Sequence, residues 1–263
     1  MMKITTFLLL FLTSFMMVGF AQEGSPTNPM GYEGEMNRID QENRKQGLWE
    51  EQTPQLLSYG YYVDGEKEGI WTTYFKKKGS IYRMEAYKKG KLDGIVVEID
   101  QRGYYTMEAH YKEGLQHGAY KRFNRGSSLE EEAYYKEGKL DGPRKTYYPN
   151  KPGKVQEEVH YKAGVKDGPS KWFGPNSNLI AEYSYRNGKF NGVNKTYYES
   201  GTLMIEEVYE ENIPVGTYME YWENGNLKQK GDYKNGLKEG KWISYDKNGK
   251  EIERVKYHKG EKK

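Results

Sequence analysis

The chain has 263 residues, of which 35% are hydrophobic, 15% aromatic and 30% charged. So polar a composition is typical of disordered chains, but the 26 tyrosines argue against disorder and favour a thin β structure, because tyrosine is a good strand former. With 41 Lys and Arg against 38 Asp and Glu, the net charge of +3 gives no electrostatic case for nucleic acid as a partner, and the absence of cysteine excludes disulfides.

The N-terminus is typical of a secretory signal peptide over residues 1–21. Lys3 supplies the positive start, an apolar stretch runs to Phe20, and the small residues Gly19 and Ala21 form a cleavage site. The alternative is an uncleaved anchor helix, because the apolar run approaches membrane-spanning length. Residues 22–39 are predicted to be a flexible linker. We therefore expect an exported protein that is periplasmic, outer-membrane-associated or secreted.

The rest of the chain repeats one pattern, Tyr-x-x-Gly-x-x-x-Gly. We call its opening residue the anchor tyrosine and its two glycines the first and second glycine. Full copies begin at Tyr62, Tyr87, Tyr111, Tyr135, Tyr161, Tyr185 and Tyr233, a degenerate copy at Tyr209 and a truncated one at Tyr257. The copies follow one another at 24 to 26 residues. Fixed self-similarity at this period indicates a repeat architecture, so residues 40–263 are predicted to form an array of about nine 24-residue repeats.

A period of this length has room for two strands and two turns. Asp64-Gly65, Asn187-Gly188 and Asn235-Gly236 are dipeptides that favour tight hairpins. Each repeat should therefore be one β-hairpin. The predicted fold is all-β, an elongated single-layer antiparallel meander of stacked hairpins, with about seventeen strands at ~4.8 Å spacing over roughly 80 Å.

A column of aromatic residues lies five positions after the second glycine. Its members are Tyr74, Phe123, Tyr147, Phe173, Tyr197, Tyr221 and Tyr245, with Ile99 in the remaining copy. Stacked repeats would align these side chains along one face of the sheet. Two interpretations stay open: the column is the core of the sheet, or it is a groove of accessible rings that grips a ligand.

The same face should carry a ladder of lysines and glutamates. Lys121, Lys145, Lys171 and Lys195 lie two positions before the aromatic column, and Glu108, Glu132, Glu158, Glu182 and Glu206 lie three positions before the next anchor tyrosine. We expect Lys121 opposite Glu132 and Lys195 opposite Glu206, which would fix the strand register. In the last copies Lys230 and Arg254 should lie opposite Met219 and Ile243, where the ladder ends.

Both ends of the array differ from its middle. Two positions after the second glycine, the outer copies carry Trp49, Trp71, Tyr218 and Trp242, whereas central copies carry Arg144, Ser170 and Asn194. Terminal repeats are commonly atypical because they cover open edges, so capping is one interpretation. The other is a candidate C-terminal binding patch of Tyr218, Trp222 and Trp242.

The repeat resembles the MORN repeat (membrane occupation and recognition nexus) in its bacterial variant, over about residues 40–263. The anchor tyrosine, the glycine pair and the following aromatic carry the resemblance, as in YKEGKLDGPRKTYY and YKNGLKEGKWISY. It implies an elongated array of β-hairpins that binds proteins or lipid surfaces and has no catalytic centre. Bacterial relatives are often labelled antitoxin components.

The residues suggest no catalytic or metal site. His110 and His160 share a column two copies apart, roughly 20 Å, which is too far for one metal ion. Asp93, Asp141 and Asp167, with His117 in the same column, precede glycine in turns, so turn propensity explains them. We find no catalytic motif and expect neither an enzyme nor a cofactor.

The leading hypothesis is a non-enzymatic exported scaffold that binds another protein of the cell envelope or outside the cell. Membrane-surface or glycan binding through the aromatic column is the first alternative, since Tyr and Trp suit membrane interfaces and stack on sugars. An antitoxin or immunity partner of a toxin is the second. Nucleic acid is not expected as a partner.

Overall fold

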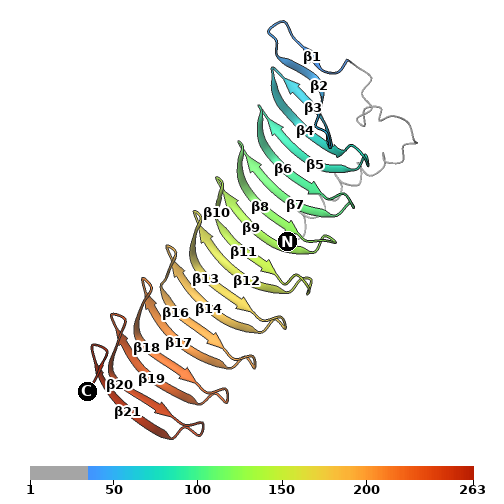
Figure 1. Cartoon of the computed structure of the whole chain (residues 1–263). Helices are drawn as coiled ribbons and strands as arrows, with labels where there is room; N and C mark the ends of the chain where they lie inside the picture. Colours follow the sequence, from blue (N-terminus) through green and yellow to red (C-terminus); the bar gives the residue numbers. More distant parts are fainter. Residues whose placement is uncertain (1–34) are drawn as a thin grey trace, which may run out of the picture. The chain divides into compact units, whose positions relative to one another are not determined.

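The computed structural model describes residues 35–263. The predicted signal peptide and residues 22–34 of the predicted linker lie outside the described residues. Within the described part the chain is all-β, without a helix, and its 22 strands belong to one antiparallel sheet. Figure 1 shows the hairpins following one another in chain order from β1 to β21.

The strands have the following bounds: β1 Arg38–Ile39, β2 Lys45–Gln52, β3 Leu56–Val63, β4 Glu66–Phe75, β5 Ile81–Lys88, β6 Lys91–Ile99, β7 Tyr105–Lys112, β8 Leu115–Phe123, β9 Leu129–Lys136, β10 Lys139–Leu140, β11 Gly142–Tyr147, β12 Val155–Lys162, β13 Val165–Phe173, β14 Leu179–Arg186, β15 Lys189–Phe190, β16 Gly192–Tyr197, β17 Leu203–Glu210, β18 Ile213–Tyr221, β19 Leu227–Lys234, β20 Leu237–Tyr245, β21 Glu251–His258 and β22 Glu261–Lys262.

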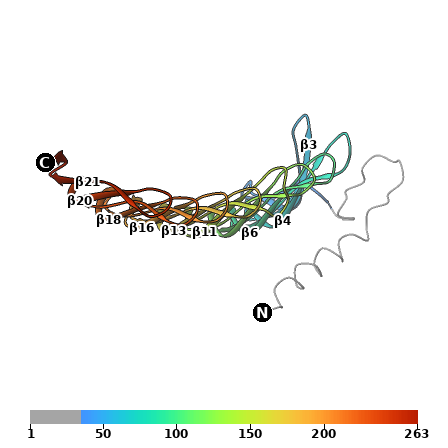
Figure 2. The same ribbon diagram turned by 90° about the horizontal axis from the view of Figure 1, so that it is seen from below.

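The sheet is the predicted single-layer meander, because each strand pairs only with strands next to it in chain order, apart from β9 with β11 and β14 with β16, which pair past the short strands β10 and β15. Figure 2 shows this layer from below as one thin, curved sheet. The count of 22 exceeds the expected seventeen partly because β10–β11 and β15–β16 are single strands interrupted at Asp141 and Asn191. There the two amides turn to donate hydrogen bonds to the carbonyls of Tyr134 and Ser184. The two-residue strands β1 and β22 at the ends add two more, which leaves eighteen main strands against the expected seventeen.

The hairpin turns adopt the conformation that the Asp-Gly and Asn-Gly dipeptides favour. Asn187 has φ 50° and Gly188 has φ 79°, both in the left-handed region that a tight hairpin requires. Ala163 takes the same position in another copy with φ 50°, although alanine has no side chain that favours it. The repeat geometry therefore overrides local preference at these turns.

Successive hairpins are also joined through their turns. The first-glycine amide donates to a carbonyl of the preceding repeat, as from Gly138 to Gln116 at 2.8 Å and from Gly164 to Leu140 at 2.7 Å. A carboxylate adds a second bond, since Asp141 Oδ2 accepts from the amide of Ala163 at 3.1 Å. Asp93 does the same two repeats before, and Asp167 does the same one repeat after. We call this arrangement the turn ladder, and it gives these aspartates a structural role.

Removal of one such carboxylate should lower stability measurably. Asp141→Ala is expected to cost about 1 kcal/mol of unfolding free energy, because the Ala163 amide loses its side-chain acceptor. Asp141→Asn retains an acceptor oxygen and serves as the matched control, with little expected change. Urea unfolding followed by tyrosine and tryptophan fluorescence measures both. Equal losses in the two variants would contradict a hydrogen-bonding role.

The cross-strand partners define two faces of the sheet, and one of them carries the predicted ladder. Lys121 pairs with Glu132 and Lys195 with Glu206, and the second pair closes to 3.1 Å between Nζ and Oε2. Ion pairs also join Lys145 to Glu158 and Lys171 to Glu182. The ladder ends where predicted, with Met219 opposite Lys230 and Ile243 opposite Arg254. We call this side the ladder face.

The opposite side, which we call the anchor face, holds the anchor tyrosines and most of the buried apolar side chains. The latter include Trp71, Val96, Ala109, Ala133, Val159, Ala181 and Trp242. They lie in the middle of strands, where side chains from the two adjacent strands cover them. The core is therefore a narrow stripe, as expected for a sheet of one layer.

Candidate functional site

The aromatic column lies on the ladder face and is half-buried along its whole length. Most of its members pair with an aliphatic residue on the next strand, as Phe123 pairs with Leu129 and Tyr197 with Leu203. Tyr147 donates from its hydroxyl to Glu132 Oε1 at 2.7 Å. Between the rings of column members themselves no contact is found in the described sheet. The column is thus a mixed aromatic and aliphatic stripe with partly accessible rings.

The candidate C-terminal patch divides into two separate places. Tyr218 stacks on Trp242 with ring centroids 5.5 Å apart, and Trp242 is 3% exposed. Trp222 instead donates from Nε1 to the carbonyl of Tyr245 at 3.0 Å, with Lys228 Nζ over its ring. The structure therefore brings together two of the three residues, and the buried Trp242 is part of the packing of this end.

The two ends of the array use the same packing unit. Trp71 lies against Gly60, where an added Cβ would come within 2.2 Å of the indole, and Lys67 Nζ lies 3.8 Å from the ring on the other side. Trp242 repeats this arrangement with Gly231 at 2.3 Å and Lys238 at 3.9 Å. Each indole is thus held between a glycine and a lysine.

We call the column of Trp71 and Trp242 the Trp position, and the column of Gly60 and Gly231, two residues before the anchor tyrosine, the glycine position. Side-chain sizes at these two positions are complementary along the anchor face. Where the Trp position holds Tyr120, the glycine position holds Ala109. In the central copies Ser170 takes the Trp position and lies opposite Tyr183. No indole covers Tyr183 there, since Asn194 follows in the next copy. The middle of the anchor face therefore lacks the cover that the tryptophans give at both ends.

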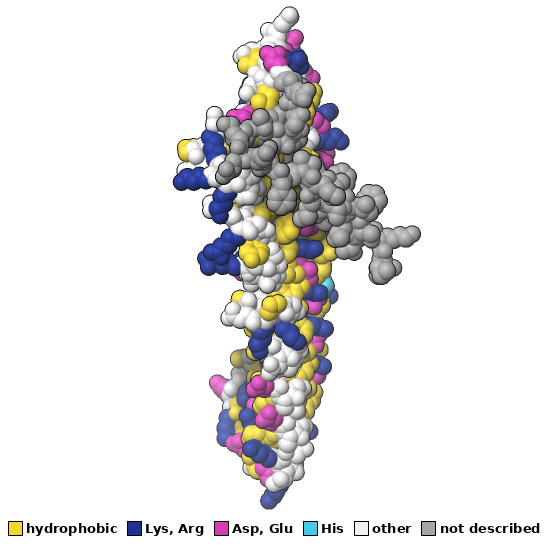
Figure 3. Space-filling view, turned by 90° about the vertical axis from the view of Figure 1, so that its right-hand side faces the viewer, with side chains coloured by type: hydrophobic (Ala, Val, Ile, Leu, Met, Phe, Trp, Pro, Cys, Tyr) yellow, Lys and Arg dark blue, Asp and Glu magenta, His cyan; other side chains and the backbone are white. Residues whose placement is uncertain are grey.

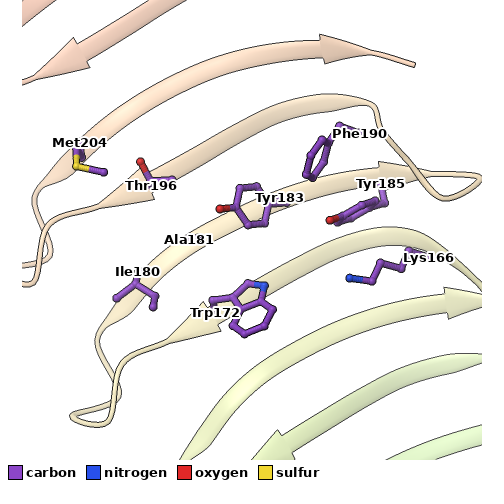
Figure 4. Close-up of a pocket in the computed structure, with 9 residues that line it drawn as sticks. All are labelled: Lys166, Trp172, Ile180, Ala181, Tyr183, Tyr185, Phe190, Thr196 and Met204. Atoms are coloured by element: carbon purple, nitrogen blue, oxygen red, sulfur yellow. The ribbon is translucent and has the colours of Figure 1, made fainter. Parts of the chain in front are cut away.

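A groove of about 520 Å³ opens at this uncovered place. Figure 4 shows the side chains that surround it, drawn from β13 to β17. They are Lys166, Trp172, Ile180, Ala181, Tyr183, Tyr185, Phe190, Thr196 and Met204. Phe190 is central to the aromatic wall, with ring centroids 4.8 Å from Tyr185 and 5.4 Å from Tyr183.

The groove offers two polar groups at its apolar wall. Lys166 Nζ lies 5.0 Å from the Tyr185 ring centroid and 3.9 Å from Glu157 Oε1. Thr196 Oγ1 is buried and has no hydrogen-bond partner in the described structure. A ligand that enters the groove could therefore pack on the rings and donate to or accept from this hydroxyl.

Sequence reasoning missed this groove because β-bulges change which side chains reach it. The β-bulge between Trp172 and Phe173 leaves Ile180 on β14 outside the cross-strand pairing. The equivalent bulge between Thr196 and Tyr197 does the same for Met204 on β17. Simple alternation places both residues on the ladder face, yet both line the groove on the anchor face. The one signal in the sequence was the replacement of Trp by Ser170 and Asn194.

The N-terminal end of the anchor face has a cluster of charged groups around Glu51. Burial raises the pKa of this carboxyl, but hydrogen bonds from Lys45 Nζ, Tyr62 Oη and Lys67 Nζ outweigh burial and lower the pKa from 4.5 to about 2. A carboxylate whose pKa is depressed by folding stabilises the fold above its unfolded pKa, and this contribution is lost as the pH falls through the folded pKa.

The pH dependence of stability should therefore change when Glu51 loses its charge. Between pH 4.5 and pH 2 the melting temperature of the parent chain should fall, and in Glu51→Gln the fall should be smaller, because glutamine does not titrate. Differential scanning fluorimetry across this range measures the effect. Parallel curves for the two chains would show that Glu51 does not contribute to the acid transition.

Neither a metal cluster nor a membrane helix is found in the part of the chain that the structure describes. Over residues 35–263 no group of three or more His, Asp or Glu side chains could hold a metal ion. The same residues include no helix with the length and apolarity to cross a bilayer.

Comparison with known families identifies the repeat. Five consecutive segments match the family described as MORN repeat variant, over residues 140–163, 166–187, 190–211, 214–235 and 238–259. No curated protein matches the chain. Residues 140–259 therefore carry MORN-type repeats, and they contain the whole groove. Repeats of this type generally serve as scaffolds for interaction with proteins or membranes.

Proposed function

We propose, from the MORN-type repeats of residues 140–259, that the chain is a non-enzymatic exported scaffold that binds a partner protein. The observation that carries the proposal is the groove on the anchor face. Its aromatic wall, formed by Trp172, Tyr183 and Phe190, suits the apolar side chains that dominate the energy of protein interfaces.

The dimensions and chemistry of the groove favour a protein ligand. About 520 Å³ accommodates a few side chains, and the groove is open rather than enclosed, so an extended surface can approach it. Lys166 provides one charge and Thr196 one unpartnered hydroxyl, which would orient a ligand. Apolar contact with a few polar groups is the usual composition of such interfaces.

Site-specific photocrosslinking tests this proposal. A benzophenone amino acid at Ile180, which lines the groove and is 37% exposed, should capture a defined protein from the native envelope. The matched control is the same group at Val193, which is 41% exposed but lies outside the groove. Addition of Tyr183→Ala should reduce capture at Ile180. Equal capture at both positions, or none at Ile180, would contradict binding in the groove.

The aromatic column supports membrane-surface or glycan binding as a second candidate, because its rings are partly accessible along the ladder face. Liposome flotation and a glycan pull-down measure it, and Tyr147→Ala with Tyr197→Ala should then reduce retention. Retention by neither surface would remove this candidate.

Export rests on the sequence of residues 1–21. After expression in a host with a secretory pathway, the mature chain should begin at Gln22, and N-terminal sequencing measures this. A chain that keeps its N-terminus in the cytoplasm would contradict export and would favour the antitoxin alternative.

A further inference from the structure

One edge of the sheet concentrates positive charge. We define the basic edge as the turns between the anchor tyrosine and the residue after the first glycine in five successive copies, which are residues 88–91, 112–115, 136–139, 162–165 and 186–189. These turns contain nine Lys or Arg residues and two Glu. The corresponding turns on either side are acidic, with Asp64 and Glu66 before them and Glu210 and Glu211 after them. In a chain whose net charge is only +3, the charge is segregated here.

One column of the basic edge is exposed and unpaired. Lys88, Lys112, Lys136, Lys162 and Arg186 each directly follow an anchor tyrosine, and all five are exposed. Within the described residues none of them forms an ion pair. Of the nearby carboxylates, those of Asp93, Asp141 and Asp167 accept from turn amides, and Glu113 and Glu137 in the same turns form no ion pair with these cations in the described part of the chain. The five cations therefore face solvent without a partner.

The spacing of this column is fixed by the turn ladder. Each hairpin contributes two strands at ~4.8 Å, so equivalent turns repeat every ~9.6 Å. The bonds from Gly114 to Leu92, from Gly138 to Gln116 and from Gly164 to Leu140, at 2.7 to 2.8 Å, hold neighbouring turns together. Four intervals place the five cations over ~38 Å.

Only some extended ligands can match one charge to each cation. In polyproline II, three residues make one turn and advance ~9.3 Å, so every third side chain points the same way and four turns cover ~37 Å. In a β-strand, positions three apart advance ~10 Å but point to opposite sides. In an α-helix, positions seven apart advance ~10.5 Å, so five such positions span ~42 Å and exceed the length of the row of cations by about 4 Å.

We propose that the basic edge binds an extended acidic protein segment in the polyproline II conformation, with an Asp or Glu at every third residue. One carboxylate would meet each of Lys88, Lys112, Lys136, Lys162 and Arg186. Leu115 and Val165, which are 52% and 44% exposed in the same turns, would contact the residues between the acids. This inference rests on the proposed role as a protein-binding scaffold and names the chemistry of its partner.

Nucleic acid fits this edge less well than an acidic peptide. Single strands are held by aromatic side chains on which bases stack, and the five turns contain no aromatic residue. Their aliphatic side chains instead match the apolar residues of a peptide. Binding to phosphatidylserine vesicles distinguishes anionic lipid from the acidic peptide.

The test measures binding of a fluorescein-labelled peptide of five Glu-Pro-Pro triplets to the full chain by fluorescence anisotropy at low salt. We expect saturable binding that weakens as salt is raised. The triple variant Lys112→Glu, Lys136→Glu, Lys162→Glu should weaken it about tenfold or more. The control triple Lys77→Glu, Arg125→Glu, Lys154→Glu makes the same charge change in exposed turns of the opposite edge, which faces the viewer in Figure 3, and should weaken it less than about twofold.

Four further probes decide between ligands. A peptide with five consecutive Glu followed by ten Pro has the same composition and should bind more weakly; equal binding would overturn the period-three match. Tighter binding of a helical peptide with Glu at every seventh residue, or of phosphatidylserine vesicles or oligothymidylate, through the same three lysines would overturn the assignment to this segment. Thermal melts of both triples check folding. If the Glu-Pro-Pro peptide does not bind, this inference fails. Crosslinking at Ile180 that persists in the triple variant of Lys112, Lys136 and Lys162 would then leave the proposed function intact.

Discussion

Gly231→Ala is expected to destabilise the chain by about 2–4 kcal/mol, a large effect for the addition of one methyl group. The backbone of Gly231 is extended, so the cost does not arise from a special φ. It arises because the new Cβ would lie 2.3 Å from the indole of Trp242. That indole is 3% exposed and donates from Nε1 to the carbonyl of Asp232 at 3.3 Å, so it cannot move away without losing packing and a hydrogen bond.

A second substitution should rescue this loss. Ala109 lies opposite Tyr120 in the same two columns, which shows that an alanine is accommodated when the ring across the strand is smaller. Trp242→Tyr alone should cost about 1–2 kcal/mol, and the double variant Gly231→Ala, Trp242→Tyr should be no less stable than Trp242→Tyr. Urea unfolding of the four chains gives the coupling energy. Additive losses would show that the indole is not the obstacle.

Glu131→Ala should have the second largest effect, about 2–3 kcal/mol, because it leaves two arginines without their shared carboxylate. Arg144 Nε lies 2.6 Å from Glu131 Oε1 and Arg122 Nη2 lies 3.0 Å from Oε2, while the glutamate side chain is 11% exposed. The loss of this partner at the centre of the anchor face leaves Arg144 with Glu157 at 3.7 Å as its remaining ion pair.

Glu130, the residue before Glu131, provides the matched control. Glu130 contacts the same Arg122 at 2.8 Å, but its side chain is 34% exposed. Glu130→Ala makes the same charge change and removes an equally short contact, yet it should cost about 0.5 kcal/mol or less, because water can replace an exposed partner. Equal losses from the two substitutions would show that burial does not set the value of the pair.

The sequence predicts the fold well because the repeat carries its own register. The second glycine and the anchor tyrosine recur at fixed offsets, so Lys121 and Glu132 must meet once the hairpins form, and the structure confirms this pairing. The end of the ladder at Met219 and Ile243 is confirmed for the same reason. A one-residue slip would have reversed every face.

The candidate site was less predictable because it depends on departures from the repeat. The bulges that turn Ile180 and Met204 toward the anchor face are invisible to a strict alternation of side chains. The division of the C-terminal patch has a similar cause, since Trp222 lies beyond the bulge between Glu220 and Tyr221 and donates a hydrogen bond to the carbonyl of Tyr245. Such departures are set by packing between strands, which no single copy encodes.

The turn ladder also bears on how this protein could change in length. Each junction between hairpins uses the same amide-to-carbonyl bond, from Gly90 to Lys67 near one end to Gly260 to Lys238 at the other. Removal or duplication of one whole copy would therefore rejoin surfaces that already fit, whereas removal of half a copy would not. Such a change would alter the reach of the array in steps of ~9.6 Å. The number of copies therefore fixes the length of the sheet along the direction in which the hairpins stack.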